Sequence, residues 1–160
     1  MEESILNEWE AFYRVVFGLR IDLSSFDVFE AFIPSRKIIV VAKDLTADSL
    51  FLACQHHFGA ARYGKDFSSI TSSRRAYANY MVEFDDEKTP IDATRQLRYV
   101  PLTVEERLVL ELWHYRTHGT FYDPHFTHLC EGSRYPDKTY PGVFVDRERK
   151  ELSVGFPLTF

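Results

Sequence analysis

The stretch "LTVEERLVLELWHYRTHG", residues 102–119, carries the strongest helix signal in the chain. Thr103 and Glu106 have the spacing of a capping box, in which each side chain bonds the other residue's backbone N–H. Apolar residues recur at helical spacing over this stretch: Val104, Leu108, Leu112 and Tyr115. Gly119 follows at a position typical of a helix C-terminus. The pattern predicts an amphipathic helix from just after Thr103 to just before Gly119.

Two more helices are expected before this one. Apolar spacing predicts a helix over residues 3–17, although a strand beginning at about Tyr13 is a rival interpretation because the sequence there is rich in β-formers. The run "KIIVVA", 37–42, is typical of a central strand covered on both faces. A buried helix face is expected to follow up to Gly59, with Asp44 or Thr46 as its N-cap.

The later part of the chain is rich in short strand signals. The segments that favour strands are "YANYMVEF" (77–84), "FTHLCEG" (126–132), "GVFV" (142–145) and "ELSVGF" (151–156), with "DRERKE" (146–151) as a charged hairpin loop. The segment "DATRQLRYVP", 92–101, has no decisive period. Helices and strands are interspersed without strict alternation. We therefore expect an α+β fold, one compact domain over residues 1–160, with a mixed, mainly antiparallel sheet packed against two or three helices.

Composition narrows the class of protein. With 160 residues, 45% hydrophobic and 27% charged, the chain has the make-up of one globular domain. The net charge of −5 argues against nucleic acid as the partner, because that ligand needs a positive field. The sequence has no apolar run long enough to cross a bilayer, and its acidic start is unlike a signal peptide. We expect a cytoplasmic protein whose two cysteines, Cys54 and Cys130, stay reduced.

A histidine-rich stretch offers a candidate metal site. Glu111, His114 and His118 lie three and four residues apart on the predicted helix, so their side chains share one stripe with Arg107. Imidazole and carboxylate groups suit zinc or another divalent metal, and the ligands expected to complete the sphere are Asp123, His125 or His128. The alternative is that the stripe is the solvated face of an amphipathic helix and that no cofactor is bound.

A cysteine–histidine pair is a second candidate. If residues 126–130 form a strand, His128 and Cys130 point to the same face, where the imidazole could lower the thiol pKa. Asp123 or Glu131 is placed to orient the ring. The alternative is that Cys130 packs as a small hydrophobic side chain, as we expect for Cys54 on the buried face of its helix.

The stretch "GSRYPD" offers a third candidate, a small-anion site. Backbone amides near Ser133 and the guanidinium of Arg134 suit a carboxylate or phosphate, with Tyr135 and Asp137 beside them. The alternative is a structural turn in which Arg134 pairs with Asp137. Arg74 and Arg75 in "SSRRAY" could likewise contact phosphate, but in an acidic chain a solvated loop is the expectation.

The last motif also carries a resemblance. The stretch "HLCEGSRYPDKTYPGVFV", 128–145, is similar to a T-L-C-x-G-S-R-Y-x-D-G-x-V-P motif, and "DLS", "IIVVAKDLTADSLFLAC" and "LTVEERLVLEL" fit the same pattern. From Phe12 onward the chain resembles a family of uncharacterised bacterial proteins, and the resemblance implies no activity. In that pattern a threonine stands at the position of His128 and a glycine at that of Lys138. Nothing in the pattern calls for His114, His118 or His125, so the resemblance gives no support to a metal site on these histidines.

Fingerprints of common enzymes are missing from the sequence. It contains no P-loop, no G-x-G-x-x-G, no G-x-S-x-G and no C-x-x-C. We therefore expect a non-catalytic binding or interaction module whose partner is another protein or a second copy of this chain. The alternatives are a metal-dependent enzyme using the Glu/His cluster at 111–128, and a small-anion binder at the GSRY turn.

Overall fold

Helix α3 (Val104–His118) forms between two caps that the sequence predicts. Thr103 accepts a hydrogen bond from the backbone of Glu106, whose side chain bonds the Thr103 backbone in return. At the other end Gly119 adopts a left-handed conformation with φ 71°, which residues with a Cβ avoid. The computed structural model describes residues 2–26, 36–64, 66–85, 91–92 and 97–155.

Six strands form the main sheet of the described chain, in the order β2-β10-β9-β7-β6-β5. Their bounds are β2 Ala60–Tyr63, β5 Ile91–Asp92, β6 Leu97–Val100, β7 Thr127–Cys130, β9 Gly142–Asp146 and β10 Glu151–Gly155. Strands β2 and β10 run parallel, as do β6 and β7, and the other neighbours are antiparallel. The expected α+β class with a mixed, mainly antiparallel sheet is confirmed.

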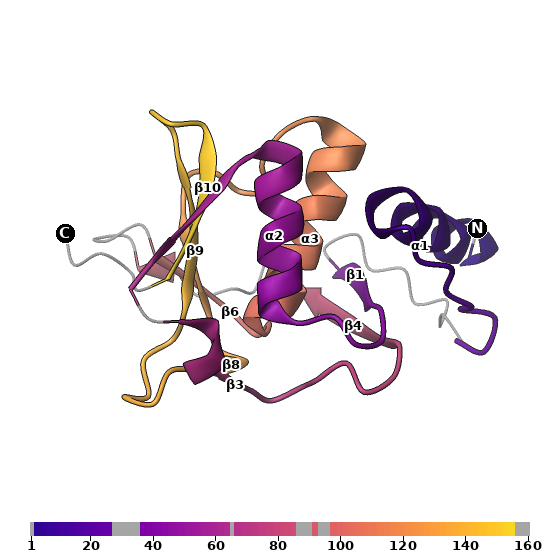
Figure 1. Ribbon diagram of the computed structural model, residues 1–160, viewed down its shortest axis with the longest axis horizontal. Coiled ribbons are helices and arrows are strands. Elements are labelled where there is room, and N and C mark those ends of the chain that lie inside the picture. Colours follow the sequence, from indigo (N-terminus) through magenta and orange to yellow (C-terminus); the bar gives the residue numbers. More distant parts are fainter. Residues whose placement is uncertain (1, 27–35, 65, 86–90, 93–96, 156–160) are drawn as a thin grey trace.

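Helices α2 (Ala47–Phe58) and α3 lie side by side and cover one face of this sheet (Figure 1). Thr46 is the N-cap of α2, which settles the choice between Asp44 and Thr46. Between the helices and the sheet lies a core of buried aliphatic side chains that includes Leu50, Leu108, Leu112, Val143, Leu152 and Val154. Cys54 is buried in the same core, as predicted. Burial of these apolar surfaces holds the helices against the sheet.

A two-stranded antiparallel ribbon of β1 (Arg36–Val41) and β4 (Tyr80–Asp85) lies on the other side of α3 (Figure 1). The run "KIIVVA" is thus a strand, and Ile39, Val40 and Val41 are buried. The prediction that it is central in the sheet is wrong for the described residues, where β1 pairs with β4 alone. The apolar side chains of β1 are buried because helices cover the strand, and not because it has a neighbouring strand on each edge.

Helix α1 (Glu2–Phe17) lies at the far end of the molecule, beyond this ribbon (Figure 1). Trp9 stacks on Trp113 of α3, with ring centroids 4.1 Å apart. The buried Tyr13 hydroxyl donates to the carbonyl of Val40 over 2.6 Å and accepts from the amide of Ala42. The helix prediction over 3–17 is confirmed, and the rival strand at Tyr13 is wrong because these aromatic contacts need a helical face.

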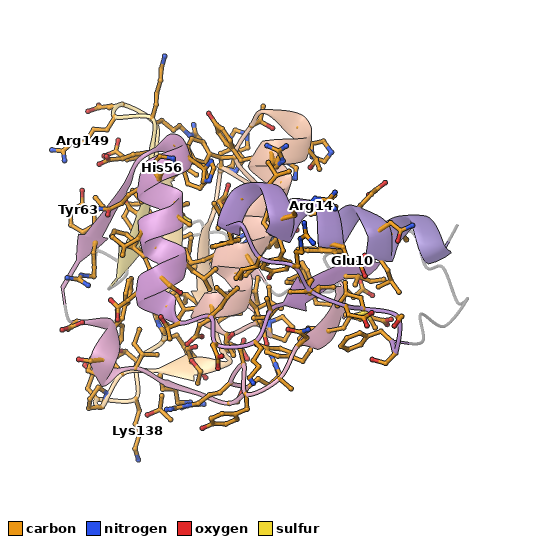
Figure 2. All side chains as sticks on the ribbon, turned by 45° about the vertical axis from the view of Figure 1, so that its right-hand side comes forward. Glu10, Arg14, His56, Tyr63, Lys138 and Arg149 are labelled. Carbon is orange, nitrogen blue, oxygen red and sulfur yellow. The ribbon has the colours of Figure 1, made fainter. Side chains whose placement is uncertain are left out.

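Three short elements complete the described chain: a 3₁₀ turn η1 (Phe67–Ser69) and strands β3 (Thr71–Ser72) and β8 (Ser133–Arg134), which pair with each other. The predicted hairpin loop at 146–151 joins β9 to β10. Strand β6 is a strand that the sequence pattern did not indicate. Exposed Arg14, Lys138 and Arg149 project from the surface (Figure 2). None of the helices in the described part of the chain has the length and hydropathy needed to span a bilayer.

Candidate functional site

A buried ion pair occupies the middle of α3. Arg107 and Glu111 are 1% and 0% exposed, and the Arg107 Nη1 atom lies 2.6 Å from Glu111 Oε2. Glu111 also accepts from the backbone amide of Tyr122 over 2.7 Å. The prediction that this stripe is a solvated helix face is wrong for these two residues. Their charges are tolerated inside the protein because each has a partner.

The same arginine fixes a histidine. Arg107 Nε donates to Nδ1 of His128 over 3.0 Å, and His128 Nε2 lies 2.7 Å from Oδ2 of Asp123. Because a guanidinium can only donate, Nδ1 of His128 is an acceptor and its proton is on Nε2, shared with Asp123. Arg98 of β6 lies 3.2 Å from the same carboxylate oxygen. We call Arg98, Arg107, Glu111, Asp123 and His128 the Arg107 network.

Burial shapes the protonation of the Arg107 network. It lowers the pKa of His128 to about 4, although the hydrogen bond to Asp123 favours the charged imidazole. For Asp123, partial burial opposes ionisation, but the bond from His128 and the charges of Arg98 and Arg107 hold its pKa below the ordinary value. At neutral pH the network therefore contains the neutral imidazole of His128 between two ion pairs, Arg107–Glu111 and Arg98–Asp123.

The candidate metal ligands separate into three places. Glu111 and His128 both bind Arg107, which fills the space between them with a cation. His114 and His118 stack on each other at the end of α3 with ring centroids 4.2 Å apart, and partial burial lowers the pKa of His114 to about 4. His125 bonds Arg147. Across the described residues, no group of three or more histidine, cysteine, aspartate or glutamate side chains is arranged to hold a metal.

The structure does not support the hypothesis that His128 activates the Cys130 thiol. Cys130 and His128 are both buried, but both ring nitrogens of His128 have other partners. Burial raises the pKa of the Cys130 thiol to about 12, so the prediction of a lowered pKa is wrong. Cys130 packs as a small hydrophobic side chain in the core.

The GSRY turn is tied into the fold through several contacts. Gly132 approaches α3 so closely that an added Cβ would lie 2.7 Å from the amide nitrogen of Thr103. Exposed Arg134 stacks over Tyr140 and donates to its hydroxyl. Tyr135 is buried, and the carboxylate of Asp137 accepts from Thr139. The structure thus gives Arg134 an aromatic partner, where the sequence suggested an ion pair with Asp137.

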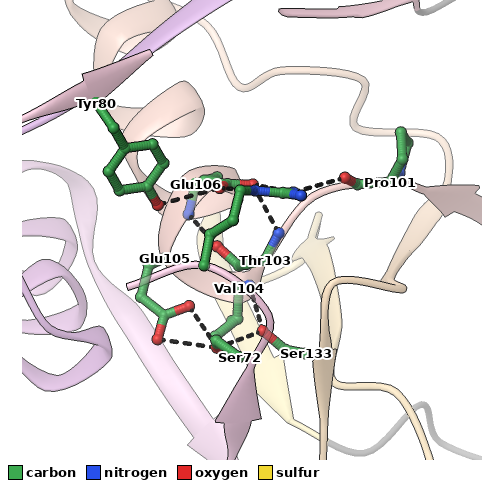
Figure 3. A network of polar contacts seen from close by, with 9 residues as sticks. Ser72, Tyr80, Pro101, Thr103, Val104, Glu105, Glu106 and Ser133 are labelled. Carbon is green, nitrogen blue, oxygen red and sulfur yellow. Dashed lines mark hydrogen bonds and ion pairs between the residues drawn. The ribbon is translucent and has the colours of Figure 1, made fainter. Parts of the chain in front are cut away.

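Ser133, the remaining residue of that candidate site, belongs to a second cluster at the start of α3. Its hydroxyl accepts from the amide of Val104 over 2.9 Å and lies 2.7 Å from the hydroxyl of Ser72. Ser72 in turn donates to the carboxylate of Glu105 over 2.8 Å (Figure 3). Pairing of β3 with β8 places the two serines opposite each other. A chain of hydrogen bonds therefore leads from the helix N-terminus to Glu105.

Glu106 joins the cluster from the next position of the helix. Arg74 donates to Glu106 through Nε over 2.6 Å and through Nη2 over 2.9 Å, and Nη2 also donates to the carbonyl of Pro101. The hydroxyl of Tyr80 donates to the same carboxylate. Arg74 is thus a structural partner of Glu106, which corrects the expectation of a solvated loop. We call Ser72, Arg74, Tyr80, Thr103, Glu105, Glu106 and Ser133 the capping network.

A pocket of about 390 Å³ opens beside the capping network. Its wall comes from the end of β1, the start of α2, the segment 67–77, and the first turn of α3. The polar lining residues are Asp44, Thr46, Asp48, Ser68, Ser72, Arg74, Arg75, Tyr77, Tyr80 and Glu105, and the apolar ones include Val41, Leu45, Phe67 and Ile70. Tyr77 is 78% exposed. The pocket brings together residues from segments far apart in the sequence.

Sequence reasoning pointed to the periphery of this site and missed its centre. The capping box identified Thr103 and Glu106, and "GSRYPD" identified Ser133, but Glu105 and Tyr80 carry no signal of their own. Neither Ser72 nor Arg74 could be assigned to the start of α3, because only the pairing of β3 with β8 brings them there. Comparisons of the chain with family models, with curated proteins and with solved structures found no match.

Proposed function

We propose that this chain is a non-catalytic binding module and that the pocket beside the capping network holds its ligand. The observation that carries the proposal is the pocket itself, whose volume of about 390 Å³ is in the range of sites for small molecules. Its lining combines ten polar side chains with aliphatic and aromatic ones. Such a mixture gives a ligand both apolar contact and directional hydrogen bonds.

The pocket wall is held in place before any ligand arrives. Glu106 is fully buried and is bonded by Arg74, Tyr80 and the backbone of Thr103. A wall whose side chains are fixed by neighbours loses little conformational entropy on binding, which improves affinity. The capping network therefore supports a role in recognition.

The hydrogen-bonded serines are better suited to this role than to catalysis. Ser72 donates its proton to Glu105, and a carboxylate is a weak base for activating a serine hydroxyl. We therefore assign the Ser133–Ser72–Glu105 chain to holding the wall. The partner predicted from the sequence, another protein or a second copy of this chain, stays a prediction. Sedimentation equilibrium tests for the second copy, and a pull-down tests for another protein.

The experiment is a fragment screen read by ¹H–¹⁵N NMR spectra of the labelled protein. Bound fragments should shift the amide signals of Ser68, Ser72, Tyr77 and Glu105. The variant Ser68→Trp places an indole at the exposed lining position and should remove most of these shifts. Glu148→Trp, in the β9–β10 turn, is the matched control and should bind like the wild type. Fragments that bind both tryptophan variants equally would contradict the proposal.

A further inference from the structure

The hydroxyl hydrogens around the start of α3, on Ser72, Ser133 and Tyr80, are already committed. The Val104 amide donates to Ser133, and Glu105 can only accept, so the one hydroxyl proton of Ser72 goes to Glu105 and that of Ser133 goes to Ser72. In the same way Tyr80 donates its only proton to Glu106. These groups keep lone pairs that can accept hydrogen bonds. The wall around the start of α3 therefore offers acceptors to a ligand.

Glu105 is the strongest of these acceptors. Among the described residues, its carboxylate accepts from the hydroxyl of Ser72 and has no ion-pair partner, whereas the neighbouring Glu106 is paired with Arg74. It lies in the first turn of α3, at the positive end of the helix dipole. A carboxylate with two oxygens has room for several donors. Glu105 thus presents an uncompensated negative charge to the pocket.

The rest of the lining adds to this field. Asp44 and Asp48 contribute two more carboxylates, of which Asp48 forms an ion pair with Arg62 over 3.6 Å. The charge of Arg74 is balanced by Glu106 behind it, and Arg75 is exposed. The lining thus carries three carboxylates, of Asp44, Asp48 and Glu105, and two guanidinium groups, of Arg74 and Arg75. The balance favours a cation over an anion.

The aromatic side chains suit the same kind of ligand. Phe67, Tyr77 and Tyr80 line the pocket, and aromatic faces attract ammonium groups as well as apolar rings. A ligand with an apolar body and one positive end can therefore use both parts of the wall. An anionic ligand would meet the carboxylates of Asp44 and Glu105 at close range.

We propose that the pocket binds a small ligand that carries a protonated amine, whose N–H groups donate to Glu105 while its apolar body packs among the aromatic side chains. This inference rests on the proposed function, since it names the ligand class for the same pocket. Three probes of nearly equal size separate charge from shape: tyramine is cationic, tyrosol is neutral and 4-hydroxyphenylacetate is anionic.

The experiment is calorimetric titration of the full chain with each probe, accompanied by NMR mapping. Tyramine should bind at least tenfold more tightly than tyrosol or 4-hydroxyphenylacetate. Glu105→Gln keeps an acceptor for Ser72 but removes the charge, and should weaken tyramine binding at least tenfold while tyrosol is unaffected. Glu131→Gln, an exposed position outside the pocket, is the matched control. Melting curves of both variants verify that they are folded.

The outcomes distinguish the two proposals. If tyrosol or the anion binds in the pocket as tightly as tyramine, the ammonium inference is overturned and the binding function stands. If tyramine binds Glu105→Gln as tightly as it binds the wild type, the assignment to Glu105 is overturned. If no probe and no fragment shifts the pocket amides, the proposed function falls together with the inference.

Discussion

Arg107 donates its Nε hydrogen to Nδ1 of His128, and this one bond fixes the tautomer of a fully buried imidazole. A second proton on His128 would have to replace that donor and would place two cations in contact. The bond also links α3 to β7, so the charge state of His128 is coupled to the packing of helix on sheet. The first prediction follows from this coupling.

We expect the protein to lose stability as the pH falls from 7 to 5. The folded pKa of His128 is about 4, below its ordinary value of 6.5, so the unfolded chain binds the proton more readily. The contribution of His128 is fully present above pH 6.5 and is lost as the pH falls toward 4. Linkage gives a loss of about 2 kcal/mol between pH 7 and 5. Urea unfolding at the two pH values measures it.

The control for that experiment is the variant His128→Asn, whose amide oxygen can still accept from Arg107. Between pH 7 and 5, the loss in its free energy of unfolding should be about 2 kcal/mol smaller than the loss in the wild type. His56→Asn, at an exposed position, should retain the wild-type pH dependence. Equal pH dependence in all three proteins would show that His128 is not the responsible group.

Removing both partners of the buried ion pair should cost less than the sum of removing each one alone. Arg107→Met leaves Glu111 buried without its cation, and Glu111→Leu leaves Arg107 without its anion. Each single change should destabilise the protein by about 3–5 kcal/mol. The double variant should lie well below the sum of the two, because no uncompensated charge remains. A double-mutant cycle by urea denaturation tests this, and additive losses would contradict it.

Gly132 should tolerate alanine less well than Gly119. A Cβ at Gly132 would lie 2.7–2.9 Å from backbone atoms of Leu102 and Thr103, whereas a Cβ at Gly119 has nothing within 4 Å. We expect Gly119→Ala to cost about 1 kcal/mol, from its left-handed backbone alone. Gly132→Ala should cost about 1–3 kcal/mol through steric overlap and should exceed it. Thermal melting ranks the two, and the reverse order would contradict the close approach.

The histidine stretch should not hold a stoichiometric metal through Glu111. Its carboxylate is bound to Arg107 and to the amide of Tyr122, so a metal there would have to displace both partners. Elemental analysis of protein purified without a nickel column should give the same metal content for the wild type and for His114→Ala/His118→Ala. A ratio near one that the double variant abolishes would restore the metal hypothesis.

The sequence predicted the elements of this fold better than their surroundings. N-cap residues and apolar spacing are local signals, and they located α2 and α3 closely. A helical stripe shows which residues share a face but not what that face meets, so the burial of Arg107 and Glu111 was not predictable. Strand β6 lacks an alternating pattern because Arg98 lies within it, with Asp123 and the ring of Phe126 as its partners.

The candidate site shows the same division. Thr103, Glu106 and Ser133 each stand in a recognisable motif, whereas the pocket depends on tertiary contacts between β3, β4 and the start of α3. Such contacts join segments separated by about thirty residues or more, as in the pairing of Arg74 with Glu106. No periodic pattern records them.

The most direct test of the central claim is the position of a bound fragment in crystals soaked with the hits of the screen. The account predicts electron density between Tyr80, Phe67 and Glu105, with a hydrogen-bond donor of the fragment facing the Glu105 carboxylate. Density found only on other surfaces, with this pocket occupied by water in every soak, would contradict the account.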